Sequence, residues 1–201
     1  MEALVVVDVQ NDFCPCGALP VPRGDEVVPV INGLLHRYAL VVASQDWHPP
    51  DHVSFATNHP GKKPLDVVEV AGQEQVLWPK HCVQGSWGAA FHQDLDTRAF
   101  RLIVRKGTDP AVDSYSAFRD NRQDKSTGLA GFLRELGVTR VTVVGLATDY
   151  CVQATAKDAV ALGFAAAVLL PACRAVDQPP GRLQAVLQEL RSAGVTLQEN
   201  P

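Results

Sequence analysis

The chain has 201 residues, of which 46% are apolar and 20% are charged. This length and composition are typical of one globular domain and exclude a disordered chain. The longest uncharged apolar stretch, at about residues 164–172, is shorter than the roughly 20 residues of a membrane-spanning helix, and a net charge of −4 without a Lys/Arg cluster argues against nucleic acid as a partner. We expect one domain over residues 1–201 that binds neither nucleic acid nor a membrane.

The N-terminus runs from Met1 directly into an apolar stretch that meets Asp8, with no basic start and no separate cleavage region. It therefore differs from a signal peptide, and we expect a cytoplasmic protein. Five cysteines are an odd number in a chain of this size, which favours reduced thiols over a disulfide framework. At least one thiol is then available for chemistry.

Short β-branched segments alternate along the chain with segments of helical periodicity, which is the pattern of βαβ units around a mainly parallel sheet. The expected strands are residues 3–9, 40–44, 101–105, 140–145 and 165–170. The expected helices lie near residues 27–35, 129–136, 152–163 and 183–190, and Gly137, Gly163 and Gly194 stand where three of them should end. Residues 46–95 are different, because they are rich in His, Trp, Pro and Gly without a clear period. We expect this long irregular segment to carry a site.

Reactive side chains follow several of the expected strands, namely Asp8, Asp46, Lys106 and Cys151. Ligands of a doubly wound parallel sheet bind beyond the carboxyl ends of its strands, so we expect these four side chains to lie together. Cys151 is the most informative of them, because Thr148 or Asp149 could cap a helix whose first turn holds the thiol. A helix N-terminus favours the thiolate and can bind an oxyanion. We interpret Cys151 as a nucleophile, and Cys82 and Cys173 as buried apolar residues.

Asp8 ends an apolar strand, where burying a carboxylate without a partner is costly. We expect Lys106 or Cys151 as its partner, and a partly desolvated carboxyl could pass a proton between the thiol and a leaving group. The alternative is an aspartate that only caps the turn at residues 10–12. Lys106 would favour both a thiolate and a carboxylate without itself reacting, although on its own it would be an ordinary lysine at a strand end.

Asp46-Trp47-His48 contains a carboxylate and an imidazole that face the same side of an extended segment, which the following Pro49 favours. His81 could supply a third ligand. Two imidazoles and one carboxylate, with positions left open for water or substrate, suit zinc, iron or manganese.

Other residues near this edge remain candidates. His52 and Ser54 are further possible ligands or water holders, His59 and His92 are interpreted as surface residues, and Cys14-Pro-Cys16 stays unassigned. Phe13, Trp78 and Tyr115 could wall a slot for a flat ring or be plain packing.

Five motifs occur in order along the chain, namely Val6-Val-Asp-Val-Gln-Asn-Asp-Phe, Gln45-Asp-Trp-His-Pro, Trp78-Pro-Lys-His-Cys-Val, Lys106-Gly-Thr and Gly145-Leu-Ala-Thr-Asp-Tyr-Cys-Val. Together they resemble the motifs of the nicotinamidases within the isochorismatase-like cysteine hydrolases. The resemblance implies a three-layer α/β/α fold with a six-stranded, mainly parallel sheet.

The resemblance also implies a site. Its catalytic triad would be Asp8, Lys106 and Cys151, its metal ligands Asp46, His48 and His81, and its oxyanion hole the backbone N–H groups of Ala147 and Cys151, beside a cis peptide bond between Leu146 and Ala147. The cofactor would be one divalent metal ion, zinc first, with iron and manganese as alternatives. Some family members carry a further His where Ser54 stands here, which leaves the last coordination position and the part of His52 open.

The implied activity is hydrolysis of nicotinamide to nicotinic acid and ammonia through a thioacyl intermediate on Cys151, a step of NAD salvage. In this mechanism the metal ion binds the pyridine nitrogen and orients the ring between Phe13 and Trp78. Pyrazinamide is a further candidate substrate, and a homo-oligomer stays open.

Three alternatives remain at this point. Another hydrolase of the superfamily would act on isochorismate or an N-carbamoyl compound, and such relatives generally lack the metal trio. A non-catalytic binding domain would need neither nucleophile, acid nor cation. A thiol redox protein would want a second cysteine within a few residues of Cys151, which is absent from the sequence.

Overall fold

A six-stranded parallel sheet forms the centre of the computed structural model, which describes residues 1–200. The strand order is β5-β2-β1-β6-β7-β8. The strands are β1 (Glu2–Val7), β2 (Leu40–Asp46), β5 (Phe100–Lys106), β6 (Arg140–Leu146), β7 (Ala165–Arg174) and β8 (Thr196–Gln198). The first five match the strands expected from the sequence, apart from their ends. Asp8 lies just beyond β1 and has a positive φ of 49°.

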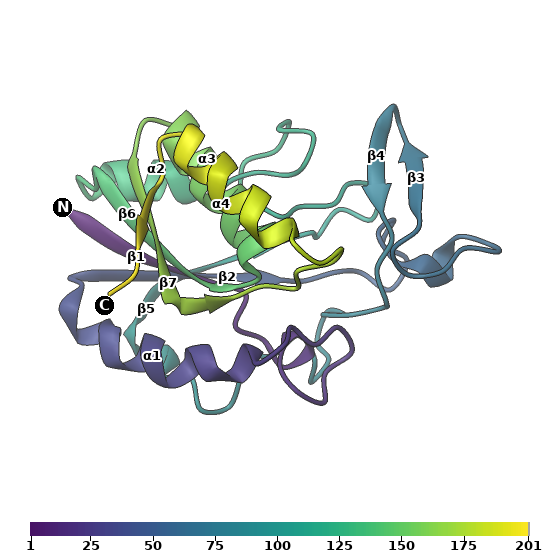
Figure 1. Ribbon diagram of the computed structural model, residues 1–201, viewed down its shortest axis with the longest axis horizontal. Coiled ribbons are helices and arrows are strands. Elements are labelled where there is room, and N and C mark those ends of the chain that lie inside the picture. Colours follow the sequence, from purple (N-terminus) through teal and green to yellow (C-terminus); the bar gives the residue numbers. More distant parts are fainter. Residues whose placement is uncertain (201) are drawn as a thin grey trace.

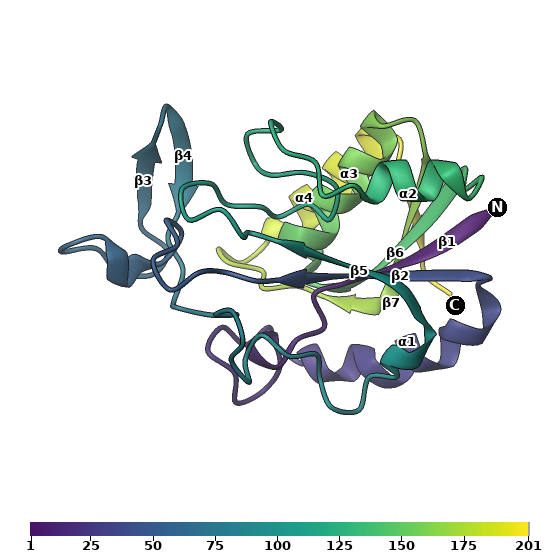
Figure 2. The same ribbon diagram turned by 180° about the vertical axis from the view of Figure 1, so that it is seen from behind.

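Helices cover both faces of this sheet. They are α1 (Val27–Leu34), α2 (Leu129–Glu135), α3 (Gln153–Ala161) and α4 (Arg182–Ser192). Figure 1 and Figure 2 show α1 on one face, and α2, α3 and α4 on the other. The three-layer α/β/α prediction is therefore confirmed. Gly137, Gly163 and Gly194 follow α2, α3 and α4 with positive φ, as expected of residues that end helices.

The central strands are buried on both faces, which explains their nearly continuous apolar sequence. In β1, Ala3, Val5 and Val7 belong to the core under α2, α3 and α4. Leu4 and Val6 alternate with them and belong to the core under α1. This alternation follows from the two-residue period of a strand. The sheet thus forms a rigid base whose carboxyl edge carries the loops described below.

The segment between β2 and β5 is irregular over most of its length, as expected. Its regular part is the antiparallel hairpin of β3 (Val67–Val70) and β4 (Gln73–Val76), which lies apart from the main sheet (Figure 1). β1 starts at the N-terminus and runs toward the side of the molecule on which this hairpin lies. The segment is held to the rest by backbone hydrogen bonds, including His48 N–H to Cys82 O at 3.0 Å and Trp78 N–H to Ser54 O at 2.7 Å.

Short helical turns complete the chain. They are Asn11–Phe13, Gly24–Glu26, Leu35–Arg37, Ala56–Asn58 and Thr97–Ala99, together with the π-helical turn Thr148–Val152. Cys151 therefore lies in a π-helical turn that precedes α3, and the expectation that it lies in the first turn of a capped α-helix is wrong. Within residues 1–200 no helix is both long and apolar enough to cross a membrane.

Candidate active site

Four side chains meet at the carboxyl edge of the sheet, as their positions after the strands predict. Asp8 follows β1, Asp46 ends β2, Lys106 ends β5, and Cys151 lies in the turn after β6. Lys106 Nζ lies 2.8 Å from Asp8 Oδ2 and 3.4 Å from Cys151 Sγ, and it also forms an ion pair with Asp46. All four side chains are buried. One ammonium therefore contacts two carboxylates and one thiol.

Asp8 is oriented by its neighbours and does not cap the turn that follows it. Ser44 Oγ donates a hydrogen bond of 2.7 Å to Asp8 Oδ1, and Oδ2 faces Lys106. The turn Asn11–Phe13 has no side-chain cap. The capping alternative is therefore wrong, and the expected partnership of Asp8 with Lys106 is present.

Burial and mutual charge set the protonation of this group. Burial alone would lower the pKa of Lys106, but Asp46 and Asp8 raise it well above its ordinary value. Burial raises the pKa of Asp8, while Lys106 opposes the rise and Asp46 adds to it. Burial also raises the pKa of Cys151 well above its usual range, against the effect of Lys106. Our expectation of a thiolate stabilised by a helix N-terminus is therefore wrong for the resting site, because desolvation outweighs the favourable charge.

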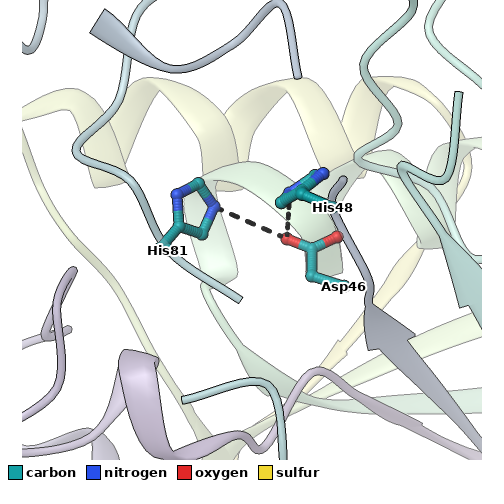
Figure 3. Close-up of side chains that lie close together, drawn as sticks. All are labelled: Asp46, His48 and His81. Atoms are coloured by element: carbon teal, nitrogen blue, oxygen red, sulfur yellow. Dashed lines mark ion pairs between the residues drawn. The ribbon is translucent and has the colours of Figure 1, made fainter. Parts of the chain in front are cut away.

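Asp46 links this group to two imidazoles. Its Oδ2 lies 3.4 Å from His48 Nε2 and 3.8 Å from His81 Nε2, and Figure 3 shows the carboxylate between the two rings. Lys106 contacts its other oxygen, Oδ1. Burial opposes ionisation of Asp46, but Lys106 and His48 hold its pKa well below the ordinary value. The carboxylate is thus charged and shared between the lysine and the histidines.

The donor set fits a divalent metal ion. The Nδ1 atoms of His48 and His81 lie 2.9 Å from Gly107 O and 2.7 Å from Pro79 O. A carbonyl oxygen only accepts, so each Nδ1 carries a hydrogen, and Nε2 of each ring is the atom on the side of Asp46. Burial opposes protonation of His48, but Asp46 raises its pKa, so this imidazole would give up its Nε2 proton when a metal ion binds. One ligand atom from each of the three residues lies within 4.8 Å of the others. Burial, together with His48, lowers the pKa of His81 to about 4, which keeps that ring neutral as a ligand must be.

Two backbone features position these ligands. Gly107 has a φ of +64°, and a Cβ there would lie 2.3 Å from Cε1 of His48, so only glycine allows the ring to approach. Gln10 is fully buried and holds the main chain of Asp46 from both sides. Its Oε1 accepts from Asp46 N at 2.8 Å, and its Nε2 donates to Asp46 O at 2.8 Å. Sequence reasoning missed Gln10, although it lies inside the first motif.

His52 and Ser54 lie behind His48. The ring centroids of His52 and His48 are 4.1 Å apart, and His52 Nδ1 is 2.8 Å from Ser54 Oγ. His52 belongs to a second possible donor group with His48 and Asp113, whereas Ser54 is engaged by His52. Burial lowers the pKa of His52 to about 4.

Two further histidines lie away from this group. His59 is half-buried, with Nε2 2.7 Å from Val53 O, and His92 is also half-buried, so neither is a plain surface residue.

A cavity opens onto the sulfur and the imidazoles. Its walls include the three expected aromatic residues, Phe13, Trp78 and Tyr115, and Trp78 Nε1 donates to Tyr115 Oη at 3.1 Å. Its remaining lining residues are Leu19, Val21, Asp46, His48, His81, Asp113, Ala147, Tyr150, Cys151 and Val176. Tyr150 adjoins the nucleophile and could have been suspected from the sequence. Leu19, Val21 and Val176 come from segments with no signal in the sequence.

The expected oxyanion donors are also at this cavity. Ala147 and Cys151 both line it, and the peptide bond between Leu146 and Ala147 is cis, as the resemblance implies. Tyr150 N–H and Val152 N–H both donate to Ala147 O at 3.1 Å, which closes the turn that carries the sulfur. Both residues that the resemblance names as oxyanion donors therefore line the same cavity.

A buried cysteine, a carboxylate and a lysine at the carboxyl edge of an α/β sheet define a candidate cysteine hydrolase site. The isochorismatase domain model matches residues 2–200, and the chain belongs to this family. It is 48% identical over 193 residues to the nicotinamidase of Acinetobacter baylyi, which covers 96% of this chain and 90% of the relative.

Solved structures agree with this assignment. The Acinetobacter baumanii nicotinamidase/pyrazinamidase has a TM-score of 0.95 and 48% identity over 98% of this chain and 95% of its own. The pyrazinamidase of Pyrococcus horikoshii in complex with zinc has a TM-score of 0.80 and 38% identity over 99% of both chains.

Proposed function

We propose that this protein hydrolyses nicotinamide to nicotinic acid and ammonia. The observation that carries the proposal is the convergence of Asp8, Lys106 and Cys151 at a cavity that also presents the Asp46, His48 and His81 donors. The nicotinamidase relatives support the same substrate. Pyrazinamide, an aromatic amide of similar shape, is proposed as a second substrate.

The first half of the reaction forms a thioester. Asp8 takes the proton of the Cys151 thiol as the sulfur attacks the amide carbonyl carbon. The raised pKa of Asp8 suits a carboxyl that takes and returns a proton. The oxyanion accepts hydrogen bonds from the Ala147 and Cys151 N–H groups. When the carbon–nitrogen bond breaks, Asp8 returns the proton to the leaving nitrogen, and ammonia departs.

The second half releases the acid. Asp8 takes a proton from a water molecule that attacks the thioester carbonyl, and the bond between carbon and sulfur breaks. The Cys151 sulfur regains a proton, and nicotinic acid leaves. Lys106 remains protonated throughout, because its pKa is well above the ordinary value. Its ammonium lies 3.4 Å from the Cys151 sulfur, so its charge stabilises the transient thiolate. The same ammonium pairs with Asp8 and so keeps this carboxylate near the sulfur.

We propose that Asp46, His48 and His81 hold one divalent metal ion, with zinc as the first choice and iron and manganese as alternatives. When bound, the ion supplies a Lewis-acidic position for the pyridine nitrogen of the substrate. Phe13 and Trp78 hold the two faces of the ring. The zinc complex of the Pyrococcus horikoshii relative supports zinc as a candidate.

We propose that the protein is cytoplasmic. All five cysteines are free in the described part of the chain, which agrees with a reducing compartment such as the cytoplasm.

The proposal is tested by ammonia release from nicotinamide by the purified protein. Protein stripped with a chelator is compared with protein reloaded with zinc, iron or manganese, and nicotinic acid is measured in parallel. We expect equal amounts of both products and activity that returns with metal. Turnover of an N-carbamoyl compound and of isochorismate is measured separately for comparison. Faster turnover of either one than of nicotinamide would refute the assignment.

A further inference from the structure

Asp149 is a fully buried carboxylate that the mechanism does not use, although it lies two residues before Cys151. The sequence offered Thr148 or Asp149 as the cap of a helix. Instead its Oδ1 accepts from Val176 N at 3.0 Å, and its Oδ2 accepts from Asp177 N at 2.8 Å. Hydrogen bonds to an ionised acceptor are stronger than neutral ones. The carboxylate therefore fastens the turn that carries the nucleophile to a segment 27 residues away.

The fastened segment, residues 175–181, connects β7 to α4 and supplies part of the cavity wall. Val176 lines the same cavity as Cys151 and Ala147. Two further contacts fix the start of α4 beside the segment: Arg182 Nη2 donates to Asp149 O at 3.3 Å, and Leu183 N donates to Asp177 Oδ1 at 2.9 Å. The two oxygens of Asp149 thus hold the backbone of Val176 and Asp177, and this backbone positions the Val176 side chain.

The triad is held by other contacts. Lys106 Nζ donates to Ser114 O at 3.0 Å, and Ser44 Oγ donates to Asp8. The turn that carries Cys151 is itself closed by the N–H groups of Tyr150 and Val152, which donate to Ala147 O at 3.1 Å. Loss of the Asp149 carboxylate would therefore loosen one wall of the cavity while the reacting groups keep their positions. A more mobile cavity wall should weaken binding of the aromatic ring, which raises KM, more than it slows the chemical steps, which set kcat. This distinction separates a positioning role from general support of the fold.

We propose that Asp149 is a positioning residue for the substrate. It holds Val176 against the cavity at a fixed distance from the Cys151 turn and so sets how the aromatic ring is seated before attack. This inference rests on the proposed hydrolysis of nicotinamide.

The test compares three variants with the wild type. Asp149→Asn keeps the shape of the side chain, but its amide NH2 group can only donate. One of the two backbone N–H groups, of Val176 or Asp177, therefore loses its acceptor. Asp177→Asn removes a charge from the same segment while its oxygen still accepts from Leu183, so it is the matched control. Val176→Ala shortens the wall side chain and leaves Asp149 intact.

Each variant is measured in two ways, by steady-state kinetics with nicotinamide and by hydrogen–deuterium exchange of the peptide that spans residues 175–181. For Asp149→Asn we expect a KM about tenfold higher, a kcat within about threefold of wild type, and faster exchange. Val176→Ala raises KM without faster exchange, and Asp177→Asn matches the wild type in both readouts.

Several results would overturn the inference. One is an active Asp149→Asn protein whose KM, or whose exchange in residues 175–181, is the same as in the wild type. A lower unfolding temperature of this variant, without a change in KM and exchange, would also count against the inference. If that variant fails to fold, an unchanged KM in Val176→Ala has the same effect. A wild-type protein without activity on nicotinamide would instead refute the proposed function, and the seating role would fall with it.

Discussion

Replacement of Lys106 by Met removes the ammonium that contacts Asp8, Asp46 and Cys151 but keeps an unbranched side chain of similar length. The lost contacts are the ion pair of 2.8 Å to Asp8 Oδ2, the ion pair to Asp46, and the bonds of 3.0 Å to Ser114 O and 3.4 Å to Cys151 Sγ. Removing one partner of a buried ion pair costs about 3–5 kcal/mol. In a chain of this size each kcal/mol lowers the unfolding temperature by about 2–4 °C, so we expect a decrease of roughly 6–20 °C.

We also expect a large decrease in kcat. Without the lysine, the two neighbouring carboxylates favour protonation, and Asp8 is then not available as a base. Loss of general acid–base catalysis reduces kcat by about 10²- to 10⁴-fold. The double variant Lys106→Met with Asp8→Asn should recover part of the lost stability, because it removes an uncompensated charge, and none of the activity.

The assays are thermal unfolding at neutral pH, followed by circular dichroism, and ammonia release at a temperature where each variant is folded. Lys157→Met is the matched control, because Lys157 pairs with Glu189 at 3.4 Å on the surface, where ion pairs contribute about 1 kcal/mol or less. An unfolding temperature for Lys106→Met within about 2 °C of the wild type would refute the reasoning on buried charge.

The other predictions concern the metal, the ring and acid stability. His81→Ala should lose metal by elemental analysis, whereas His92→Ala should retain it. Trp78→Phe loses the 3.1 Å hydrogen bond to Tyr115 and should raise KM about 3- to 10-fold, with kcat nearly unchanged. Glu26 pairs with two arginines, which lower its pKa from 4.5 to about 2, so its stabilising effect is present above pH 4.5 and is lost toward about pH 2. The difference in unfolding free energy between wild type and Glu26→Gln should shrink across that range.

Full metal content in His81→Ala would remove it from the ligand set. An unchanged KM in Trp78→Phe would show that the indole N–H has no part in holding the ring. A difference between wild type and Glu26→Gln that grows as the pH falls would contradict the sign derived from the lowered pKa.

Strands were predictable where both faces are buried, and helices were predictable where apolar residues recur with helical spacing. The apolar run of β1 and the helical spacing in α1 both follow from local composition. β8 has three residues and lies at the sheet edge, so only the family resemblance implied a sixth strand. The hairpin β3–β4 was missed, because its two strands have only four residues each and most of these residues are exposed or half-buried, so they give no core signal.

The candidate site was predictable to the extent that its chemistry is concentrated in short motifs after strands. Asp149 was misread because its partners, Val176 and Asp177, are remote in sequence. The pKa of Cys151 was misjudged because the expected helix begins only at Gln153 and burial dominates. Gln10 was missed because its role depends on the main chain of a different strand. Contacts of this kind become visible only when the fold is known.

In the proposed reaction, the Cys151 sulfur bonds to the acyl group of the substrate. The most direct measurement is the mass of protein quenched with acid during turnover of nicotinamide, with peptide mapping, beside the rate of ammonia release by Cys151→Ala. We expect a nicotinoyl group in place of the thiol hydrogen of Cys151, which disappears when substrate is exhausted. Cys151→Ala should retain metal but show no turnover. An adduct on a different cysteine, or ammonia release by Cys151→Ala at the wild-type rate, would contradict the proposed reaction.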